Sequence, residues 1–438
     1  YPAYKDSGIE WIGQVPEHWK IAQIKRISAL NPRKSTLSEE KDSLCTFLPM
    51  EKLRTNAVTL DETRPIHEVY GGYSYFCDGD ILIAKVTPCF ENGNIAIANG
   101  LVNGIGFGST EINVLRVNGK GHNRFLYYRL QEEQFRTIAK SEMRGTGGLK
   151  RVPTDLFESF TIGLPDTDEQ ATIAATLDRE TARIDALIEK KNRFVELLKE
   201  KRQGLITHAV TKGLDRNAKM KDSGIEWIGQ VPEHWEATKL KHVAAFSGGG
   251  TPSKENPDYW NGCIPWVSPK DMKHEVITDS IDHITTKGLE NSATKLIDSG
   301  AVLLVARSGI LRHTIPVGIN NVPVSLNQDM KALSLDETRV RPRFILRWVQ
   351  GLNRSLLGIW AKEGATVESL EHEYVANTRL PLPDLKEQDA ILATLDLETA
   401  RIDALISKSE QSITLLKERR AAFITAAVTG QIDLRGKQ

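Results

Sequence analysis

A long segment without proline occurs twice in this chain and predicts two long helices. The first copy covers residues 168–210, and the second begins at Lys386, 218 residues further along. Both copies are rich in Ala, Leu, Glu, Lys and Arg, which are strong helix formers. At 1.5 Å per residue each helix would span roughly 60 Å. An apolar stripe of that length would not remain exposed to water, so we expect the two helices to pack against each other.

Apolar residues follow one face of each predicted helix. Steps of four and three residues from Ile173 meet ten positions, of which seven are apolar, and this spacing is typical of coiled coils. The second copy follows the same steps, with a weaker C-terminal half. The predicted seam consists of Ile173, Leu177, Ile184, Leu187, Phe194, Leu198 and Leu205 in the first copy and of Ile391, Leu395, Ile402, Leu405, Leu416 and Phe423 in the second.

A second repeat opens each half of the chain. Residues 6–19, DSGIEWIGQVPEHW, return without change as residues 222–235. We call each copy an arm and interpret it as an irregular segment whose tryptophans pack into a domain core. The predicted segments are 1–163, the first arm and variable region; 164–221, the first helix and a polar connector; 222–381, the second arm and variable region; and 382–438, the second helix.

The two variable regions scarcely resemble each other in sequence. Residues 20–163 and 236–380 contain short β-type runs between Gly and Asn turns, with helices expected at residues 123–140 and 341–360. Each region would form a globule with a radius of gyration of about 15 Å, too small to bridge both ends of one helix, so the helices should run antiparallel. The predicted fold class is α+β: two mixed α/β, mainly β domains separated by two antiparallel helices that form a coiled-coil spacer, in a pseudo-twofold internal repeat.

The repeat also predicts where the first and last residues lie. The two offsets align Asp433 with Asp215 and Tyr4 with Met220. Residues near the two ends of the sequence should therefore lie close together, as if a connector like residues 215–220 had been cut there.

Charge and cysteine content restrict the possible functions. Lys and Arg total 57, and Asp and Glu also total 57, so the formal net charge is zero. Since DNA-binding proteins usually show a basic excess, a DNA-binding role requires positive charge gathered on one face. Cys45, Cys77, Cys89 and Cys263 show neither a CxxC pair nor a His spacing suited to zinc, so we predict no metal site and no disulfide framework. The apolar runs are too short to cross a bilayer, and we expect a cytoplasmic protein.

The sequence lacks the common motifs of catalytic centres. We find no GxxxxGK[ST] phosphate loop, no HExxH and no GxSxG. Asn256-Pro-Asp-Tyr259 is similar to the Asn-Pro-Pro-Tyr loop of amino-methyltransferases, but it lacks the second proline and any glycine-rich cofactor loop. A turn before the aromatic pair Tyr259 and Trp260 is the favoured interpretation. We predict no catalytic residue and no cofactor in this chain.

Polar and aromatic side chains are grouped in glycine-containing loops of both variable regions. Arg and Lys suit guanine edges in the major groove, and Asn and Gln suit adenine edges. Each residue alone is more often a solvated loop residue than a base contact, so only the group carries weight. The candidate DNA-binding residues are Lys85, Thr87, Glu91, Asn92, Asn94, Arg144, Lys150 and Arg151 in the first region and Lys254, Tyr259, Trp260, Trp266, Lys270, Arg307, Arg312, Asn327 and Gln328 in the second.

Taken together, these segments resemble the specificity subunit of type I restriction-modification systems. The resemblance covers the whole chain and rests on the arms, the helix starts LPDTDEQATIAATLD and LPDLKEQDAILATLD, the segments DGDILIAKVTPCFENG and GFGSTEINVLR, and GGGTPSKENPDYWNGCIPW. It implies that each variable region is a target recognition domain reading one half of a split double-stranded DNA site. It also implies that the helices dock two methyltransferase subunits, which bind S-adenosylmethionine, and that restriction subunits bind ATP with magnesium.

Two other functional classes stay open from the residues alone. A pseudo-symmetric scaffold that presents two domains to protein partners, without DNA recognition, agrees with the neutral charge. Affinity for duplex DNA and its dependence on salt separate that class from a DNA reader. A nuclease or methyltransferase would have to bind its cofactor on this chain, which equilibrium dialysis with the methyl donor would test.

Overall fold

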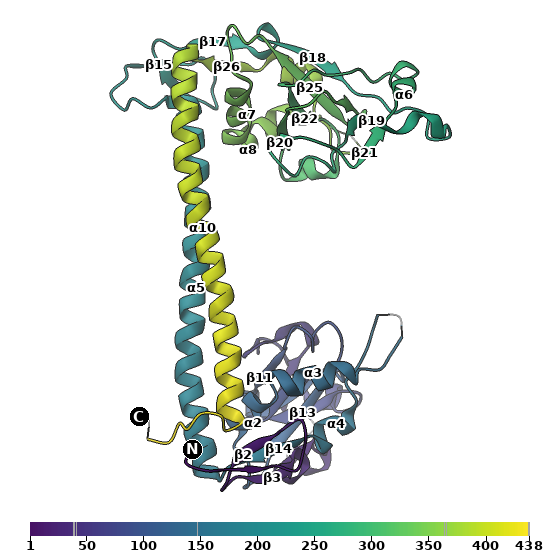
Figure 1. Cartoon of the computed structure of the whole chain (residues 1–438). Helices are drawn as coiled ribbons and strands as arrows, with labels where there is room; N and C mark the ends of the chain where they lie inside the picture. Colours follow the sequence, from purple (N-terminus) through teal and green to yellow (C-terminus); the bar gives the residue numbers. More distant parts are fainter. Residues whose placement is uncertain (38–39, 41, 147, 363, 365, 437–438) are drawn as a thin grey trace. The chain divides into compact units, whose positions relative to one another are not determined.

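The structure is a computed structural model that describes residues 1–37, 40, 42–146, 148–362, 364 and 366–436. The other residues of the predicted variable regions, and residues 437–438 of the predicted last segment, lie outside the described residues. The chain forms two compact units, Tyr1–Asn192 with Gln411–Gln438 and Arg193–Glu410. We call them the first and the second unit and describe each by itself (Figure 1). Each unit contains one arm, one variable domain and part of each long helix.

Both predicted long helices are present, and the predicted mixed fold class is confirmed. Helix α5 covers Thr167–Lys212 and helix α10 covers Leu385–Val428. In the first unit Arg420 Nε lies 2.9 Å from Asp185 Oδ1. In the second unit Arg202 Nε lies 2.9 Å from Asp403 Oδ1. Positions along α10 fall as their partners along α5 rise, so the helices pair antiparallel, as predicted.

None of the described helices is both long and apolar enough to cross a bilayer.

The structure corrects part of the predicted seam. Leu187, Phe194 and Leu405 are 43%, 45% and 46% exposed. The next residue along the helix is more buried in each case, and Val195 is only 5% exposed. The other predicted positions are buried or half-buried: Ile173, Leu177, Ile184, Leu198, Leu205, Ile391, Leu395, Ile402, Leu416 and Phe423.

Polar residues on the buried stripe explain this error. Thr181 and Thr399 are buried, and each hydroxyl donates to the carbonyl oxygen four residues earlier, that of Leu177 or Leu395, at 2.7 Å. A buried hydroxyl that keeps such a bond costs little free energy. From Leu177 and from Leu395 the buried stripe therefore steps first by four residues, to a threonine, and then by three. The prediction stepped first by three and then by four, because it selected apolar residues only.

The variable domain of the first unit is built on two four-stranded sheets. One sheet has the strand order β4-β13-β10-β11 with antiparallel neighbours. The other has the order β8-β5-β12-β9, in which β5 and β12 are parallel. The strands are β4 Ser28–Leu30, β5 Leu44–Leu48, β8 Thr63–Pro65, β9 Ser74–Cys77, β10 Ile81–Ala84, β11 Ile95–Ile97, β12 Ile105–Gly108 and β13 Ile112–Val117.

The variable domain of the second unit repeats the strand order of the first sheet, with β20 added at one edge, and has a second sheet of three strands. One sheet has the order β18-β25-β22-β23-β20, and the other has the order β21-β19-β24 with β19 and β24 parallel. Strands β18, β25, β22 and β23 correspond in order to β4, β13, β10 and β11 of the first unit. The strands are β18 Ala244–Gly248, β19 Trp260–Val267, β20 Val276–Ile277, β21 Asp282–Ile284, β22 Val302–Val305, β23 Val317–Asn320, β24 Ser325–Leu326 and β25 Met330–Leu335.

Each helix expected inside a variable region is split into two. The first unit has α2 Asn123–Arg129 and α3 Glu133–Ser141, and the second has α7 Pro342–Gly351 and α8 Asn353–Trp360. In the first unit Glu132 causes the break, because its carboxylate accepts the backbone N–H groups at the start of α3.

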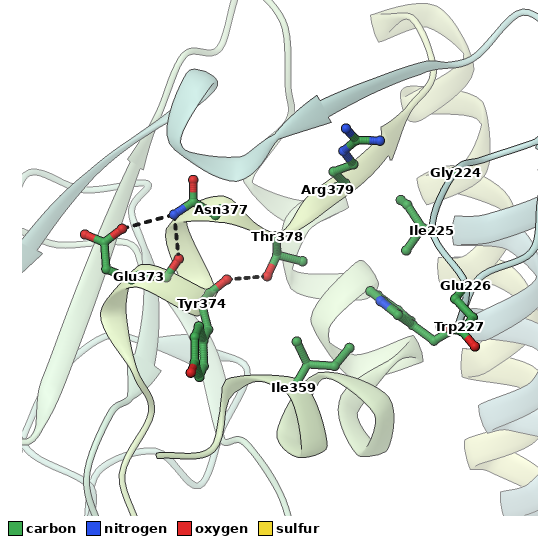
Figure 2. A pocket seen from close by; sticks show the side chains of 10 residues that line it. All are labelled: Gly224, Ile225, Glu226, Trp227, Ile359, Glu373, Tyr374, Asn377, Thr378 and Arg379. Carbon is green, nitrogen blue, oxygen red and sulfur yellow. Dashed lines mark hydrogen bonds between the residues drawn. The ribbon is translucent and has the colours of Figure 1, made fainter. Parts of the chain in front are cut away.

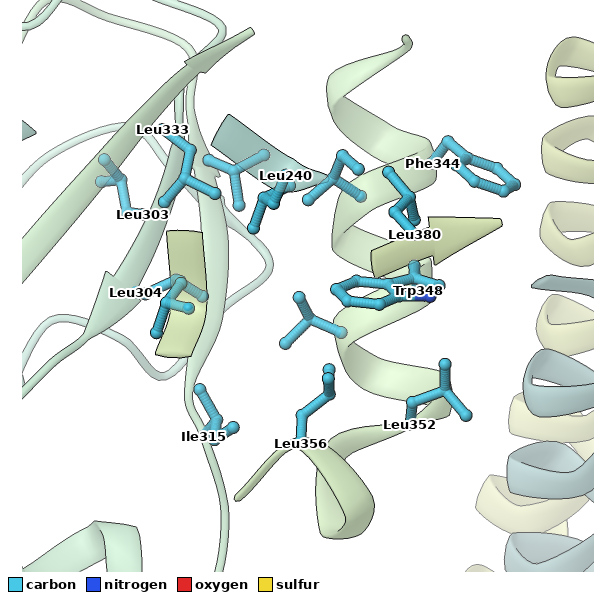
Figure 3. Close-up of a cluster of buried hydrophobic side chains, with 14 of the residues drawn as sticks. Leu240, Leu303, Leu304, Ile315, Leu333, Phe344, Trp348, Leu352, Leu356 and Leu380 are labelled. Atoms are coloured by element: carbon cyan, nitrogen blue, oxygen red, sulfur yellow. The ribbon is translucent and has the colours of Figure 1, made fainter. Parts of the chain in front are cut away.

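The core of the second unit lies between α7 and the sheet that contains β22 and β25 (Figure 3). Phe344 and Trp348 on α7 belong to the same buried cluster as Leu304 on β22 and Leu333 on β25. The cluster also takes in Ile206 and Val210 of α5 and Ile391 and Leu395 of α10. The apolar face of the long helices thus forms one wall of the domain core.

Each arm is fastened to the first turn of a long helix by one glutamate. In the first unit Trp19 Nε1 donates to Glu169 Oε1 at 3.2 Å, and His18 Nε2 lies 2.7 Å from Glu169 Oε2. Glu387 accepts from Trp235 Nε1 at 3.0 Å in the second unit and has His234 Nε2 at 2.8 Å. Both tryptophans are fully buried. The interpretation of the arms as core-packed segments is confirmed.

A glutamine beside each of these glutamates holds the backbone of the variable domain. Gln170 Oε1 accepts from His122 N at 2.8 Å, and its amide nitrogen donates to the carbonyl oxygens of Lys120 and Pro165.

The same arrangement recurs in the second unit. Gln388 accepts from Arg341 N at 2.8 Å and donates to the carbonyl oxygens of Arg339 and Pro383. We call each of these bonded sets a socket. Both sockets contact the domain through backbone atoms only.

Residues near the two ends of the sequence meet in the first unit, as the repeat predicts. Tyr4 Oη donates to the carbonyl oxygen of Gly430 at 3.1 Å, and the Arg435 guanidinium lies 4.8 Å from the centre of the Tyr1 ring. Strand β1, Tyr4–Asp6, pairs with β2, Gln14–Pro16, just as β15, Met220–Asp222, pairs with β16, Gln230–Pro232, in the second unit.

Candidate nucleic-acid interface

In the first unit, two loops that are far apart in sequence lie together at the end of β10. Arg144 and Arg151 exchange backbone hydrogen bonds, which makes residues 144–151 a hairpin whose Gly147 lies outside the described residues. Thr87, three residues after β10, donates its N–H to the Lys150 carbonyl at 2.9 Å, and its hydroxyl donates to the Gly148 carbonyl at 2.9 Å. The structure therefore brings together the two predicted loops of this domain.

Acidic partners neutralise some of the predicted cations of this hairpin. Arg151 makes a bidentate ion pair with Glu111, with Nε and Nη2 at 2.8 and 2.7 Å from the carboxylate oxygens. This pair holds the pKa of Glu111 below its usual range. Lys150 is exposed and Lys85 is half-buried, and neither makes an ion pair within the described chain. Within the described residues, Arg144 forms one ion pair, with Glu142 at 3.6 Å.

The turn after β10 presents some of its predicted polar residues and hides another. Glu91 and Asn92 are exposed, and Arg136 supports the turn from behind by donating to the Glu91 carbonyl at 2.8 Å. Asn94 is buried, at 6% exposure. Its side chain is therefore not accessible to a ligand.

The second unit repeats this arrangement with different side chains. The backbone of Arg307, two residues after β22, forms an isolated bridge with Ser369, and Lys362 N donates to the Ser369 carbonyl at 2.8 Å. Residues 361–370 thus form a second hairpin, of which residues 363 and 365 lie outside the described residues. Sequence reasoning missed it, although the 218-residue offset maps residues 144–151 onto 362–369.

Both arginines predicted to read bases in this unit have acidic partners. Arg307 Nε lies 2.6 Å from Asp329 Oδ1, and Arg312 pairs with Glu368, whose pKa is lowered by that contact. Neither carboxylate was singled out from the sequence, because each lies more than twenty residues from its arginine. Both arginines remain exposed, so the pairs orient guanidinium groups at the surface.

The aromatic and amide residues predicted in the second unit mostly build the loop. Trp266 is buried and donates Nε1–H to the Gly250 carbonyl at 2.9 Å, and Trp260 packs edge-on against it at 5.2 Å. Asn327 is buried and accepts from Asp329 N at 2.9 Å. The side chains of Trp266 and Asn327 are therefore not accessible to a ligand. The remaining predicted residues, Lys254, Tyr259, Trp260 and Gln328, are exposed or half-buried.

A basic groove of about 1220 Å³ lies beside these loops within the second unit. Its described lining includes Arg202, Lys270, Lys273, Arg312 and Arg354 but only one acidic side chain, Glu275. Glu275 is itself paired with Arg347, at 2.8 Å. Lys270, Lys273 and Arg354 make no ion pair within the described part of the chain. Cations thus predominate in the described lining of this groove although the formal net charge of the whole chain is zero, and such a groove suits a polyanion such as a DNA backbone.

Comparison with known proteins gives the same family for both halves. A family model described as type I restriction modification DNA specificity domain matches residues 16–197 and 232–415. The specificity subunit of the Escherichia coli type I restriction enzyme EcoR124I/EcoR124II is 31% identical over 225 residues, which are 51% of this chain and 48% of that protein. The chain therefore spans about half the length of that relative. The putative type I restriction enzyme MjaX specificity subunit of Methanocaldococcus jannaschii is 22% identical over 97% of this chain and 96% of its own length.

Solved structures share the fold. One comes from work on complex assembly and conformational transition of the type I R-M system. It has a TM-score of 0.77 and 18% identity, and the alignment covers 95% of this chain and 99% of that chain. The HsdS subunit from Thermoanaerobacter tengcongensis has a TM-score of 0.58 and 18% identity, with 95% and 98% covered.

Proposed function

Because this chain belongs to the family of type I restriction-modification specificity subunits, we propose that it reads a bipartite, asymmetric DNA site, with one half-site for each variable domain. It acts as a non-catalytic subunit in the cytoplasm. Two methyltransferase subunits and the restriction subunits dock on it and supply the binding sites for S-adenosylmethionine and for ATP with magnesium.

One observation carries the proposal. The two variable domains share a strand order, and each presents a hairpin fixed to the end of its central strand, but the side chains there differ. The first hairpin offers Lys150 and Arg144, whereas the second unit offers Arg307 and Arg312. Two readers with one fold and different surface groups suit two different base sequences.

The groove of the second unit supplies contacts that do not depend on sequence. Lys270, Lys273 and Arg354 are exposed cations without an ion-pair partner in the described chain, so they can neutralise phosphates without first breaking a pair. Replacing one phosphate-binding cation with a neutral residue should lower the salt dependence of binding by about one unit of slope. Phosphate contacts place the domain, and the hairpin then reads bases.

Exposed apolar residues on the helices support docking of partner subunits. Phe194 and Leu197 on α5 and Leu397 and Leu405 on α10 are exposed within the second unit. A docked subunit that covers these four side chains would remove their apolar surface from water, which favours binding. Phe194→Ala should weaken capture of the methyltransferase subunit without destabilising the chain.

The helix pair is proposed to set the distance between half-sites, about one helical turn of DNA. Inserting four residues into one helix should change the spacer or abolish modification while both half-site sequences stay readable. An unchanged spacer in the insertion mutant contradicts this part of the proposal.

The decisive experiment is sequencing of methylated bases in a strain that expresses this chain with its methyltransferase and restriction subunits. We expect one asymmetric, split motif, and tight, salt-dependent binding of the assembled complex to a duplex carrying it. A complex that forms but neither methylates nor binds duplex DNA favours the protein scaffold instead.

A further inference from the structure

The first unit fills the space beside its arm with its own phenylalanine. Trp11 of the arm packs on Phe160, with ring centres 4.5 Å apart and planes tilted by 35°. The carbonyl oxygen of Phe160 accepts from Ile24 N at 3.0 Å, which fixes its backbone just before strand β14, Thr161–Leu164.

The second unit has the same tryptophan but a threonine in the phenylalanine's place. Trp227 is the arm residue equivalent to Trp11. The carbonyl oxygen of Thr378 accepts from Leu240 N at 2.9 Å, just as that of Phe160 accepts from Ile24 N. The Thr378 hydroxyl donates to the Tyr374 carbonyl at 2.6 Å and accepts from Trp360 Nε1 at 2.7 Å. Both bonds tie the small side chain to its own domain, and it places no ring beside Trp227.

An open cavity of about 650 Å³ lies at this place in the second unit (Figure 2). Its apolar wall is formed by Ile225, Trp227, Ile359 and the ring of Tyr374, which is exposed. Apolar surface of this shape favours a flat hydrophobic group, and an aromatic ring stacks favourably on indole.

The mouth of the cavity carries a cation that the first unit lacks. Arg379 follows Thr378, whereas Thr161 follows Phe160. Arg379 is exposed and makes no ion pair within the described residues. The lining also contains two carboxylates, Glu226 and Glu373, and Glu373 accepts a hydrogen bond from Asn377 Nδ2 at 3.0 Å. Since neither carboxylate forms an ion pair with Arg379 within the described residues, the guanidinium is the group in the lining that an incoming carboxylate would contact.

We propose that this cavity binds an aromatic side chain of a protein partner, with an acidic residue next to it in the partner's sequence. The incoming ring takes the place against Trp227 that Phe160 takes against Trp11. Phe160 occupies the corresponding place in the first unit, so the site gives the repeated frame one asymmetric docking point. The inference does not depend on DNA recognition by the hairpins.

The test uses the full chain labelled with 5-fluorotryptophan and followed by fluorine NMR. The Trp227 resonance is identified from its absence in Trp227→Phe. We expect this resonance to move on titration with acetyl-Phe-Asp-amide and to respond at least about fivefold more weakly to acetyl-Ala-Asp-amide. Equal responses to the two peptides overturn the proposal.

Three variants locate the response. Thr378→Phe should abolish it by filling the cavity from within, whereas Thr378→Val, which loses the hydroxyl without adding a ring, should keep it. Trp360 loses its hydrogen-bond acceptor in both Thr378 variants, so unchanged resonances of Trp235, Trp260 and Trp266 are used to show that each variant is folded. Arg379→Glu should weaken binding of the Phe-Asp peptide and strengthen binding of acetyl-Phe-Lys-amide. This variant keeps the test valid if Thr378→Phe does not fold. Undiminished peptide binding by Thr378→Phe or by Arg379→Glu contradicts the proposal.

Two further titrations separate other occupants. Phenylacetate that saturates at a lower concentration than the peptide would assign the cavity to a small aromatic acid. Movement of the Trp227 resonance on raising the protein concentration alone would assign it to a second copy of the chain. Either result overturns docking of a protein partner.

Discussion

The arms of the two units are identical in sequence, whereas the two variable domains share a strand order and scarcely any sequence. What recurs between the domains is the set of contacts to the long helices. Arg124 Nε lies 2.9 Å from Asp178 Oδ1 in the first unit, and Arg343 Nη2 lies 2.7 Å from Asp396 Oδ1 in the second. These pairs join a domain helix to α5 or α10. The side chains that attach a domain are thus kept, and those at its hairpin are free to differ.

A fragment of residues 1–219 should have the largest effect, because it removes the second variable domain and with it the difference between the two halves. It contains one whole arm, one variable domain and α5, whose apolar stripe would lack its α10 partner. Two fragments should pair antiparallel through α5, and burial of the stripe should drive the association. With the methyltransferase subunit, this homodimer should recognise an inverted repeat of the first half-site.

Light scattering and sequencing of methylated bases check this prediction. A monomer at micromolar concentration, or methylation of an asymmetric site by the fragment complex, contradicts it.

Replacing the buried tryptophan of each arm tests whether the two identical arms act equally. Trp19→Ala and Trp235→Ala each remove a fully buried ring, and each should cost about 3–5 kcal/mol of unfolding free energy. Calorimetry should show a loss in the unit that carries the change. Trp227→Phe, at a half-buried position of the second arm, is the matched control and should cost far less. A negligible loss for either Trp→Ala variant argues against equal anchoring.

Replacing one arginine tests whether the loops of the second unit read only the second half-site. If Arg307 reads guanine, Arg307→Ala should cost about 1–3 kcal/mol at one position of the second half-site and leave the first half-site unchanged. Lys270→Ala should instead weaken binding to all sequences alike. Affinities for a set of single-base site variants measure both. An altered first half-site preference in Arg307→Ala would rule out this assignment.

Substitutions at two adjacent residues of α5 test the corrected stripe, and they have the smallest expected effect on stability. Val195→Ala should cost about 1 kcal/mol, because it removes buried methyl groups, and Phe194→Ala should change stability by less than about 0.5 kcal/mol. Thermal unfolding of the two variants is sufficient. A larger loss for Phe194→Ala would restore the stripe predicted from apolar spacing.

Local pattern and repetition carried most of what was predicted correctly. Helix-forming composition located α5 and α10, and the repeat alone indicated that Tyr4 lies near Gly430. The prediction left Thr181 and Thr399 out of the buried seam because they are polar. Their hydroxyl groups donate hydrogen bonds within the helix, so both residues can be buried, and the spacing of apolar residues does not show this.

The candidate interface was predicted less well, because its pairs join residues remote in sequence. The carboxylates of Glu111, Asp329 and Glu368 hold three of the predicted arginines, and no local pattern marks them. The burial of Asn94 likewise depends on how the turn after β10 folds back on its sheet.

The sockets of Gln170 and Gln388 have a consequence for how such proteins diversify. Each grips the inserted domain by backbone N–H and carbonyl groups, which every amino acid except proline provides in full. A foreign domain with the same strand order would therefore fit the glutamine whatever side chains it brings there, provided that it supplies an arginine for the aspartate of the long helix. If the variable domains read DNA as proposed, recombination that exchanges one domain would change the DNA specificity in a single event while the long helices stay the same.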